Sequence, residues 1–135
     1  MIELHSYFKA LESPLFSDKD NWEATQIGRL IDVHTVDHFP ELKFAQIAIF
    51  NIPEYEGSKN NSDENDCKVR SSLYALHHDN LPRIVDLGVM QLMPTRKESF
   101  KIIQDVCEVL IDEGIIPIIL GGGHDVSYAI YRAYA

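Results

Sequence analysis

The sequence has few cysteines, few basic residues and no long apolar run, and each shortage excludes a class of protein. Its two cysteines, Cys67 and Cys107, lie far apart and form neither a C-x-x-C motif nor a disulfide framework. With 12 Lys and Arg against 21 Asp and Glu, the net charge is −9, which argues against nucleic acids and anionic membranes as partners. No apolar run reaches the roughly 18 residues that span a bilayer, and the first residues show no secretion signal. We therefore expect a cytoplasmic protein with reduced cysteines.

The 135 residues suit one domain, and their apolar patterning alternates between strand and helix signals. Three short apolar runs predict strands at residues 44–50, 83–89 and 115–120. Helices are predicted after each strand, at residues 67–76, 95–113 and 126–134. This order is typical of an α/β fold with a parallel sheet and right-handed crossovers.

Local signals refine these elements. Thr95 and Glu98 form a capping box at the start of the second helix, and Gly114 ends it. Asp86 lies inside the second apolar run, so it must find hydrogen-bond partners or lie at the end of the strand. In the first helix, the stripe predicted to face the core consists of Val69, Leu73 and Leu76.

The clearest chemical signal follows the third predicted strand, which is so aliphatic that we expect burial on both faces. The next residues are Gly121, Gly122, Gly123, His124 and Asp125. The glycines permit a sharp turn, and His124 lies between strand and helix, where ligands gather in open α/β sheets. A histidine there suits a metal ion. The glycines could instead cradle a phosphate, although no G-x-G-x-x-G pattern follows, or close a tight turn with His124 as a helix cap.

Four other histidines form two sequence pairs, and turn or surface positions explain both pairs better than metal binding. His34 and His38 would share one face of a helix, but the β-branched residues between them and Pro40 disfavour a helix there. His77 and His78 fit an exposed turn at the end of the first predicted helix, where cations are favourable.

Residues 1–42 are interpreted as an N-terminal extension of a domain formed by residues 43–135. Within the extension, residues 22–26 predict a short helix, and residues 27–33 fit a helix or a strand equally well. A sheet of three strands would leave a long apolar edge unpaired. We therefore expect either the amino-terminal part of a longer α/β protein or a chain that self-associates through that edge.

Four segments in order over residues 43–135 resemble the ureohydrolase family of arginase, agmatinase and formimidoylglutamase, most of all formimidoylglutamase. The stretch from Gly121 to Asp125 is similar to the family motif GGGH[DE], and Asp86-Leu87-Gly88 is similar to its D-L-G segment. Residues 52–57 are similar to its first βα loop, and Arg70 fits the arginine of the helix after that loop.

The resemblance implies a three-layer α/β fold, of which this chain carries about the first three strands with their flanking helices. It also implies two Mn²⁺ ions with a bridging hydroxide that attacks the carbon of a guanidino or formimino substrate. His124 matches one metal ligand, Asp125 would lie beside it in a supporting role, and Gly121, Gly122 and Gly123 form the turn at the site. The family's other ligands lie in D-A-H-x-D and D-x-D motifs, and neither motif is identified among the 135 residues of this chain.

The expected function is therefore that of the amino-terminal part of a Mn-dependent hydrolase of linear amidines. Because one histidine cannot hold Mn²⁺, the chain by itself is expected to bind the metal weakly and to be inactive. Two alternatives stay open. One is a non-catalytic α/β module that forms homo-oligomers, and the other is a phosphate or nucleotide binder that uses the glycine turn.

Overall fold

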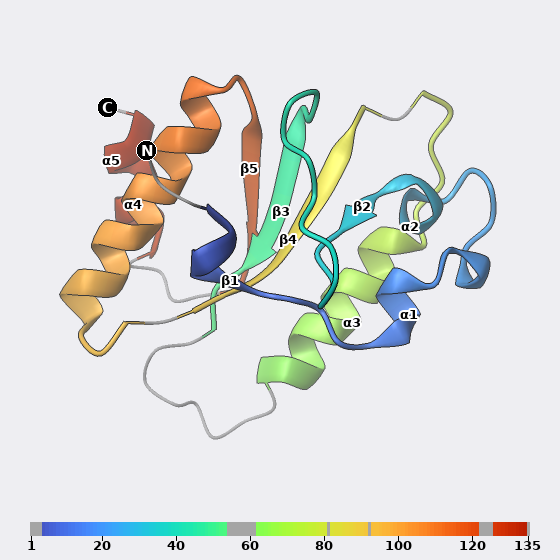
Figure 1. Cartoon of the computed structure of the whole chain (residues 1–135), viewed down its shortest axis with the longest axis horizontal. Helices are drawn as coiled ribbons and strands as arrows, with labels where there is room; N and C mark the ends of the chain where they lie inside the picture. Colours follow the sequence, from blue (N-terminus) through green and yellow to red (C-terminus); the bar gives the residue numbers. More distant parts are fainter. Residues whose placement is uncertain (1–3, 54–61, 81, 92, 122–125, 135) are drawn as a thin grey trace.

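The computed structural model is an α/β fold in three layers, with one mostly parallel sheet between two layers of helices (Figure 1). The structure describes residues 4–53, 62–80, 82–91, 93–121 and 126–134. Three parallel strands lie side by side in the order β4-β3-β5, with bounds Ile84–Met90, Ile47–Asn51 and Ile116–Leu120. The predicted fold class is confirmed.

Helices cover both faces of the sheet. On one face lies α4 (Arg96–Asp112), against which α5 (Val126–Tyr134) packs, and on the other lies α3 (Ser62–Tyr74) (Figure 1). The capping interaction of α4 is confirmed, since the Thr95 hydroxyl accepts a hydrogen bond of 3.1 Å from the Glu98 amide. Within the described residues, no helix is both long and apolar enough to span a bilayer.

Each face of the sheet has its own apolar core. The core under α4 joins Phe50 of β3 and Val85 of β4 with Val106 and Leu110 of the helix. The core on the α3 side joins Ile49 and Ile84 of the sheet with Tyr74 of α3 and with side chains that precede residue 34. The alternation of neighbouring strand residues between the two cores is the pattern of a sheet buried on both faces.

Residues 4–33 add two short strands to the sheet. The sequence did not predict the first, and the second lies in the segment 27–33 that was left open as helix or strand. β1 (Phe8–Lys9) pairs antiparallel with the carboxyl half of β4, and β2 (Asp32–Val33) pairs parallel with its amino half. Together they cover the outer edge of β4, which would otherwise offer unpaired backbone groups. The remaining short elements of this region are η1 (Leu4–Tyr7), α1 (Pro14–Ser17), η2 (Lys19–Asn21) and α2 (Ile27–Leu30).

The helix predicted at residues 22–26 is wrong, because tertiary contacts decide the conformation there. Trp22 packs on Gly28 so closely that a Cβ on the glycine would lie 2.6 Å from the indole ring. Gln26 forms an isolated bridge with His77, near the end of α3. The ambiguity at residues 27–33 has a simple resolution, since the segment is a helical turn followed by a two-residue strand.

The expectation that the third strand is buried on both faces is also wrong. β5 lies at the edge of the sheet and has one strand neighbour, β3, among the residues that the structure describes. Ile116 and Ile118, which align with Ile47 and Ile49 on the face that carries α3, are exposed. The helices of that face lie over the β4 side of the sheet and leave this part of β5 uncovered (Figure 1).

Candidate functional site

The predicted site lies at the carboxyl ends of β3 and β5. The last residues of these strands, Asn51 and Leu120, are partners in the parallel register, and the Ile52 amide donates a hydrogen bond of 3.1 Å to the Leu120 carbonyl. Gly121 follows with a φ of +77°, a conformation that favours glycine. Gly122, Gly123, His124 and Asp125 lie outside the described residues, so the roles assigned to them stay predictions.

Beneath this edge lies a buried polar cluster, which we define as Asn51, Arg70, Tyr74 and Asp86. The Arg70 guanidinium forms a two-bond ion pair with the Asp86 carboxylate, at 2.7 Å from Nε and 2.8 Å from Nη2. Its Nη1 donates to Asn51 Oδ1 at 2.9 Å. The Tyr74 hydroxyl donates to Asp86 Oδ2, and the Gly88 amide donates to Asp86 Oδ1 at 3.0 Å. The predicted need of Asp86 for partners is therefore confirmed.

The polar cluster decides which face of α3 points inward. The predicted apolar stripe is wrong at two of its three positions, because Val69 and Leu76 are exposed, whereas Leu73 packs against the core. The buried residues of this face are Arg70 and Tyr74. Asp86 projects from β4 toward the helix, and a buried carboxylate must be met by donors. The charge on the sheet therefore selects the helix face that carries the arginine and the tyrosine.

The surroundings of Tyr74 favour its protonated form, which donates a hydrogen bond to Asp86. Burial raises the pKa of its phenol well above the ordinary value, and the neighbouring Asp86 carboxylate raises the pKa further. Both oxygens of Asp86 thus accept two hydrogen bonds each, from Arg70 and either Tyr74 or Gly88. A carboxylate so fully engaged is a structural anchor and a poor metal ligand.

The D-L-G segment forms a bulge in β4 that exposes backbone groups to the polar cluster. The register shifts there, so that Ile49 faces Asp86 while Phe50 faces Gly88. Gly88 has a φ of +95°, and a Cβ at this position would lie 2.2 Å from the Lys9 carbonyl oxygen. The Gly88 carbonyl accepts a hydrogen bond from Arg70 Nη2 at 3.2 Å. The glycine is therefore required by the close approach of β1.

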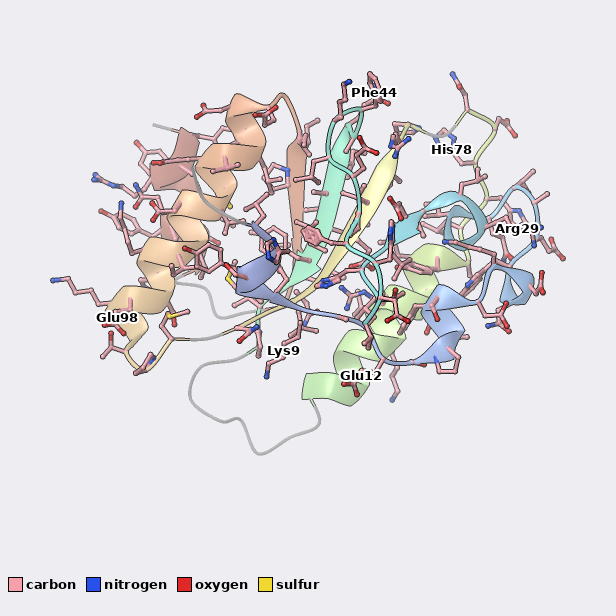
Figure 2. All side chains as sticks on the ribbon, viewed as in Figure 1. Lys9, Glu12, Arg29, Phe44, His78 and Glu98 are labelled. Atoms are coloured by element: carbon pink, nitrogen blue, oxygen red, sulfur yellow. The ribbon has the colours of Figure 1, made fainter. Side chains whose placement is uncertain are left out.

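The four histidines of the two sequence pairs each have a hydrogen-bond partner of their own. His34 Nδ1 is 2.8 Å from the Leu87 carbonyl, and His38 Nε2 is 2.7 Å from Asp32 Oδ1, so the first two imidazoles have separate partners. The segment between them is a turn, as expected. Figure 2 shows His78 at the end of the sheet where β3 and β4 begin, opposite to their carboxyl ends. His77 lies next to it in the chain, with its Nδ1 2.6 Å from Thr25 Oγ1.

The interpretation that the chain lacks a D-x-D motif is wrong, because Asp18-Lys19-Asp20 has this spacing, although it serves a local structural purpose. Asp18 caps η2 by accepting a hydrogen bond of 3.0 Å from the Asp20 amide. Lys19 donates to the carbonyls of Gly28 and Ile31 at the end of α2. Among the residues that the structure describes, no group of three or more His, Cys, Asp or Glu side chains could hold a metal ion. These residues by themselves therefore do not fit a Mn²⁺ site.

The fold and the motifs at the carboxyl edge can now be compared with known proteins. The sequence model of the arginase family matches residues 58–135, more than half of the chain. The chain belongs to the arginase family. The match includes the polar-cluster residues Arg70, Tyr74 and Asp86 and the segment that carries His124. No curated protein matches the sequence.

Solved structures of the arginase family share the fold of this chain. One is an agmatine ureohydrolase of Thermoplasma volcanium, with 20% identity and a TM-score of 0.58 over 87% of this chain and 41% of that chain. Another is a formiminoglutamase of Trypanosoma cruzi with Mn²⁺, with 20% identity and a TM-score of 0.61 over 80% of this chain and 39% of that one. The arginase-family chain described here thus spans about two-fifths of their length.

Two members of the polar cluster, Asn51 and Tyr74, were not singled out by sequence reasoning. Asn51 ends an apolar strand, and Tyr74 lies four residues after Arg70 on the same face of α3. The spacing of Arg70 and Tyr74, together with a carboxylate inside an apolar run, is the sequence signal that could have found this cluster.

Proposed function

We propose that this chain forms the amino-terminal part of a Mn-dependent ureohydrolase that cleaves a C–N bond of a guanidino or formimino compound. The observation that carries the proposal is the arginase-family match over the segment that includes His124. The parallel strands β3, β4 and β5 bring their carboxyl ends to one edge of the sheet, the usual position of ligand sites in α/β folds. A solved structure with this fold is a formiminoglutamase with Mn²⁺, which supports manganese as the metal.

In this proposal His124 is one ligand of the metal centre, Asp125 supports it, and Gly121 to Gly123 form the turn that brings both to the edge. Mn²⁺ would supply a hydroxide nucleophile and stabilise negative charge. The substrate is a small guanidino or formimino compound. The described residues contain no cluster of three or more metal-binding side chains. The remaining metal ligands therefore have to come from residues outside the described ones. The 135-residue chain by itself is therefore expected to be inactive.

The test is a hydrolysis assay with Mn²⁺ on the protein as its gene encodes it, beside the 135-residue chain. Arginine, agmatine and N-formiminoglutamate serve as substrates, and release of urea or formamide is measured. We expect release by the gene product and none by the 135-residue chain. His124→Ala should abolish release, whereas His78→Ala, at the opposite end of the sheet, should not (Figure 2). A fully active His124→Ala variant, or no release from any substrate, would contradict the proposal.

A second candidate is a homo-oligomerising α/β module without catalytic activity. The observation that favours it is the edge strand β5, on which Ile116 and Ile118 are 58% and 40% exposed. An apolar strand edge with one neighbour in the described residues is a template for pairing with another chain. A gene product of 135 residues that assembles into stable oligomers and binds no Mn²⁺ would support this candidate over the first.

A further inference from the structure

The polar cluster is costly to bury, and stability by itself explains it poorly. The side chains of Arg70 and Asp86 are 2% and 0% exposed, so both charges have lost their hydration. Well-packed apolar residues often replace such a pair without loss of stability. Pairs of this kind are better explained by the geometry that they fix, and the geometry here involves three elements.

Arg70 joins α3 to the ends of two strands at once. Its guanidinium donates to the Asn51 side chain at the end of β3, and to the Asp86 carboxylate and the Gly88 carbonyl at the bulge of β4. The guanidinium is a planar fork with fixed donor directions. The three acceptors therefore keep a fixed spacing, which a flexible lysine could not impose.

The same contacts continue to the third strand. Asn51 is the register partner of Leu120, and the amide of the next residue, Ile52, donates to the Leu120 carbonyl. Gly121, with its positive φ, comes directly after Leu120. One side-chain hydrogen bond and one backbone hydrogen bond thus connect Arg70 with the point at which the chain leaves β5.

We propose that Arg70 and Asn51 are positioning residues, which hold the carboxyl ends of β3 and β5 together and so fix the point, at Gly121, from which the proposed metal ligand His124 follows in the sequence. The link to a metal centre rests on the proposed function. The local part of the inference concerns the structure of the strand ends and is independent of any metal.

Amide hydrogen exchange tests the local part, because β3 and β5 share a hydrogen bond at each end. The Ile52 amide donates to Leu120 at the carboxyl end, and the Ile116 amide donates to Gln46 at the amino end. Asn51→Ala should accelerate exchange at Ile52 about tenfold relative to Ile116, the effect expected on losing a hydrogen bond to a charged group. Asn51→Asp keeps an acceptor for Arg70 and should leave this ratio near that of the wild type.

The control for this experiment is Asn21→Ala, which removes an exposed asparagine whose side chain donates to the carbonyls of Pro14 and Leu15. It should leave the ratio unchanged. Equal acceleration at Ile52 and Ile116 in Asn51→Ala, or no acceleration at either, would overturn the inference. If Asn51→Ala does not fold, the exchange rate at Ile52 relative to Ile116 can be measured in Arg70→Lys instead. Lysine keeps the positive charge but lacks the planar guanidinium that donates to Asn51 and Asp86 together.

Titration of the gene product with Mn²⁺ tests the link to the metal centre. Asn51→Ala should weaken Mn²⁺ binding about tenfold, in the range found for residues that support metal ligands, and Asn51→Asp should restore it. Unchanged Mn²⁺ affinity in Asn51→Ala would overturn the link. If the wild-type gene product binds no Mn²⁺, the proposed function fails, whereas the exchange ratio still decides whether these residues position the strand ends.

Discussion

Asp86 shows at the scale of single residues how a charge can occupy the interior of a sheet. Its carboxylate is fully buried in β4 and is matched by an arginine, a tyrosine hydroxyl and a backbone amide. Such a pair contributes little net stability but is costly to break, because the remaining charge stays buried without its partner.

Breaking the Arg70–Asp86 pair tests this asymmetry. Arg70→Met should lower the free energy of unfolding by about 3–5 kcal/mol, because it leaves the Asp86 carboxylate buried without its counter-charge. In urea denaturation, the double variant Arg70→Met/Asp86→Leu should lose less unfolding free energy than the sum of the losses in the two single variants. Lys101→Met is the matched control, since Lys101 is exposed and its ion pair with Asp105 is expected to contribute less than about 1 kcal/mol. Additive losses in the double variant would contradict the account.

Cys107 gives a pH dependence with a definite sign. Burial raises the pKa of its thiol from 9.0 to about 11, with a smaller contribution from Glu108. Between these two pH values the unfolded chain loses the thiol proton before the folded chain does, so stability falls as the pH rises. The stability difference between wild type and Cys107→Ala should therefore narrow by about 2 kcal/mol from pH 8 to pH 11 in urea denaturation. A difference that is independent of pH would contradict this prediction.

At the residue scale the sequence predicted part of the site. Arg70 and Asp86 were identified from motifs, and the need of Asp86 for partners followed from its place in an apolar run. Asn51 and Tyr74 were missed because their role depends on contacts with residues 12 to 19 positions away in sequence. Periodicity reports which face of an element is buried only when that face is apolar, and the inward face of α3 is partly charged.

At the scale of elements, the bulge in β4 makes a sharp prediction about two glycines. Gly88 and Gly114 both have positive φ, but a Cβ at Gly88 would clash with the Lys9 carbonyl, whereas nothing lies within 4 Å of a Cβ at Gly114. Gly114→Ala should cost about 1–2 kcal/mol from the backbone conformation. Gly88→Ala should cost about 1–3 kcal/mol more because of the clash. Equal losses of unfolding free energy in thermal or urea denaturation would show that β1 does not pack on the bulge as described.

The elements that the sequence predicted well are those whose signals are local. The capping residue Thr95 and the stop at Gly114 gave the bounds of α4, and α5 was predicted with its observed bounds. Elements of two to four residues before residue 34 are too short to show a period, so those before residue 27 were missed and residues 27–33 were left open as helix or strand. β1 and β2 exist because β4 offers them an edge, and that information is absent from their own sequence.

At the scale of the whole molecule, the two edges of the sheet differ. The outer edge of β4 is covered by β1 and β2, whereas β5 has exposed isoleucines on one face. In the described residues nothing covers this part of β5, and the sequence could not show it, because edge and central strands have the same aliphatic composition. The edge is therefore where further chain or a second copy would pack.

Self-association through β5 can be tested by a single substitution that places a charged side chain on this strand. Ile118→Lys should cost little stability because the side chain is partly exposed, but it should prevent pairing at the edge. Analytical ultracentrifugation should then show a concentration-dependent oligomer for the wild-type chain and a monomer for the variant. Val36→Lys is the control, since Val36 is exposed in the turn between Thr35 and His38 and its substitution should not change assembly. A wild-type chain that remains monomeric at high concentration would contradict self-association.

The most direct measurement is a calorimetric titration with Mn²⁺ of the gene product, of its His124→Ala variant and of the 135-residue chain. The account predicts tight binding of two ions by the gene product, loss of tight binding at one site in His124→Ala, and no tight binding by the 135-residue chain. Tight two-site binding by the 135-residue chain, or an unchanged titration after removal of the His124 imidazole, would contradict it.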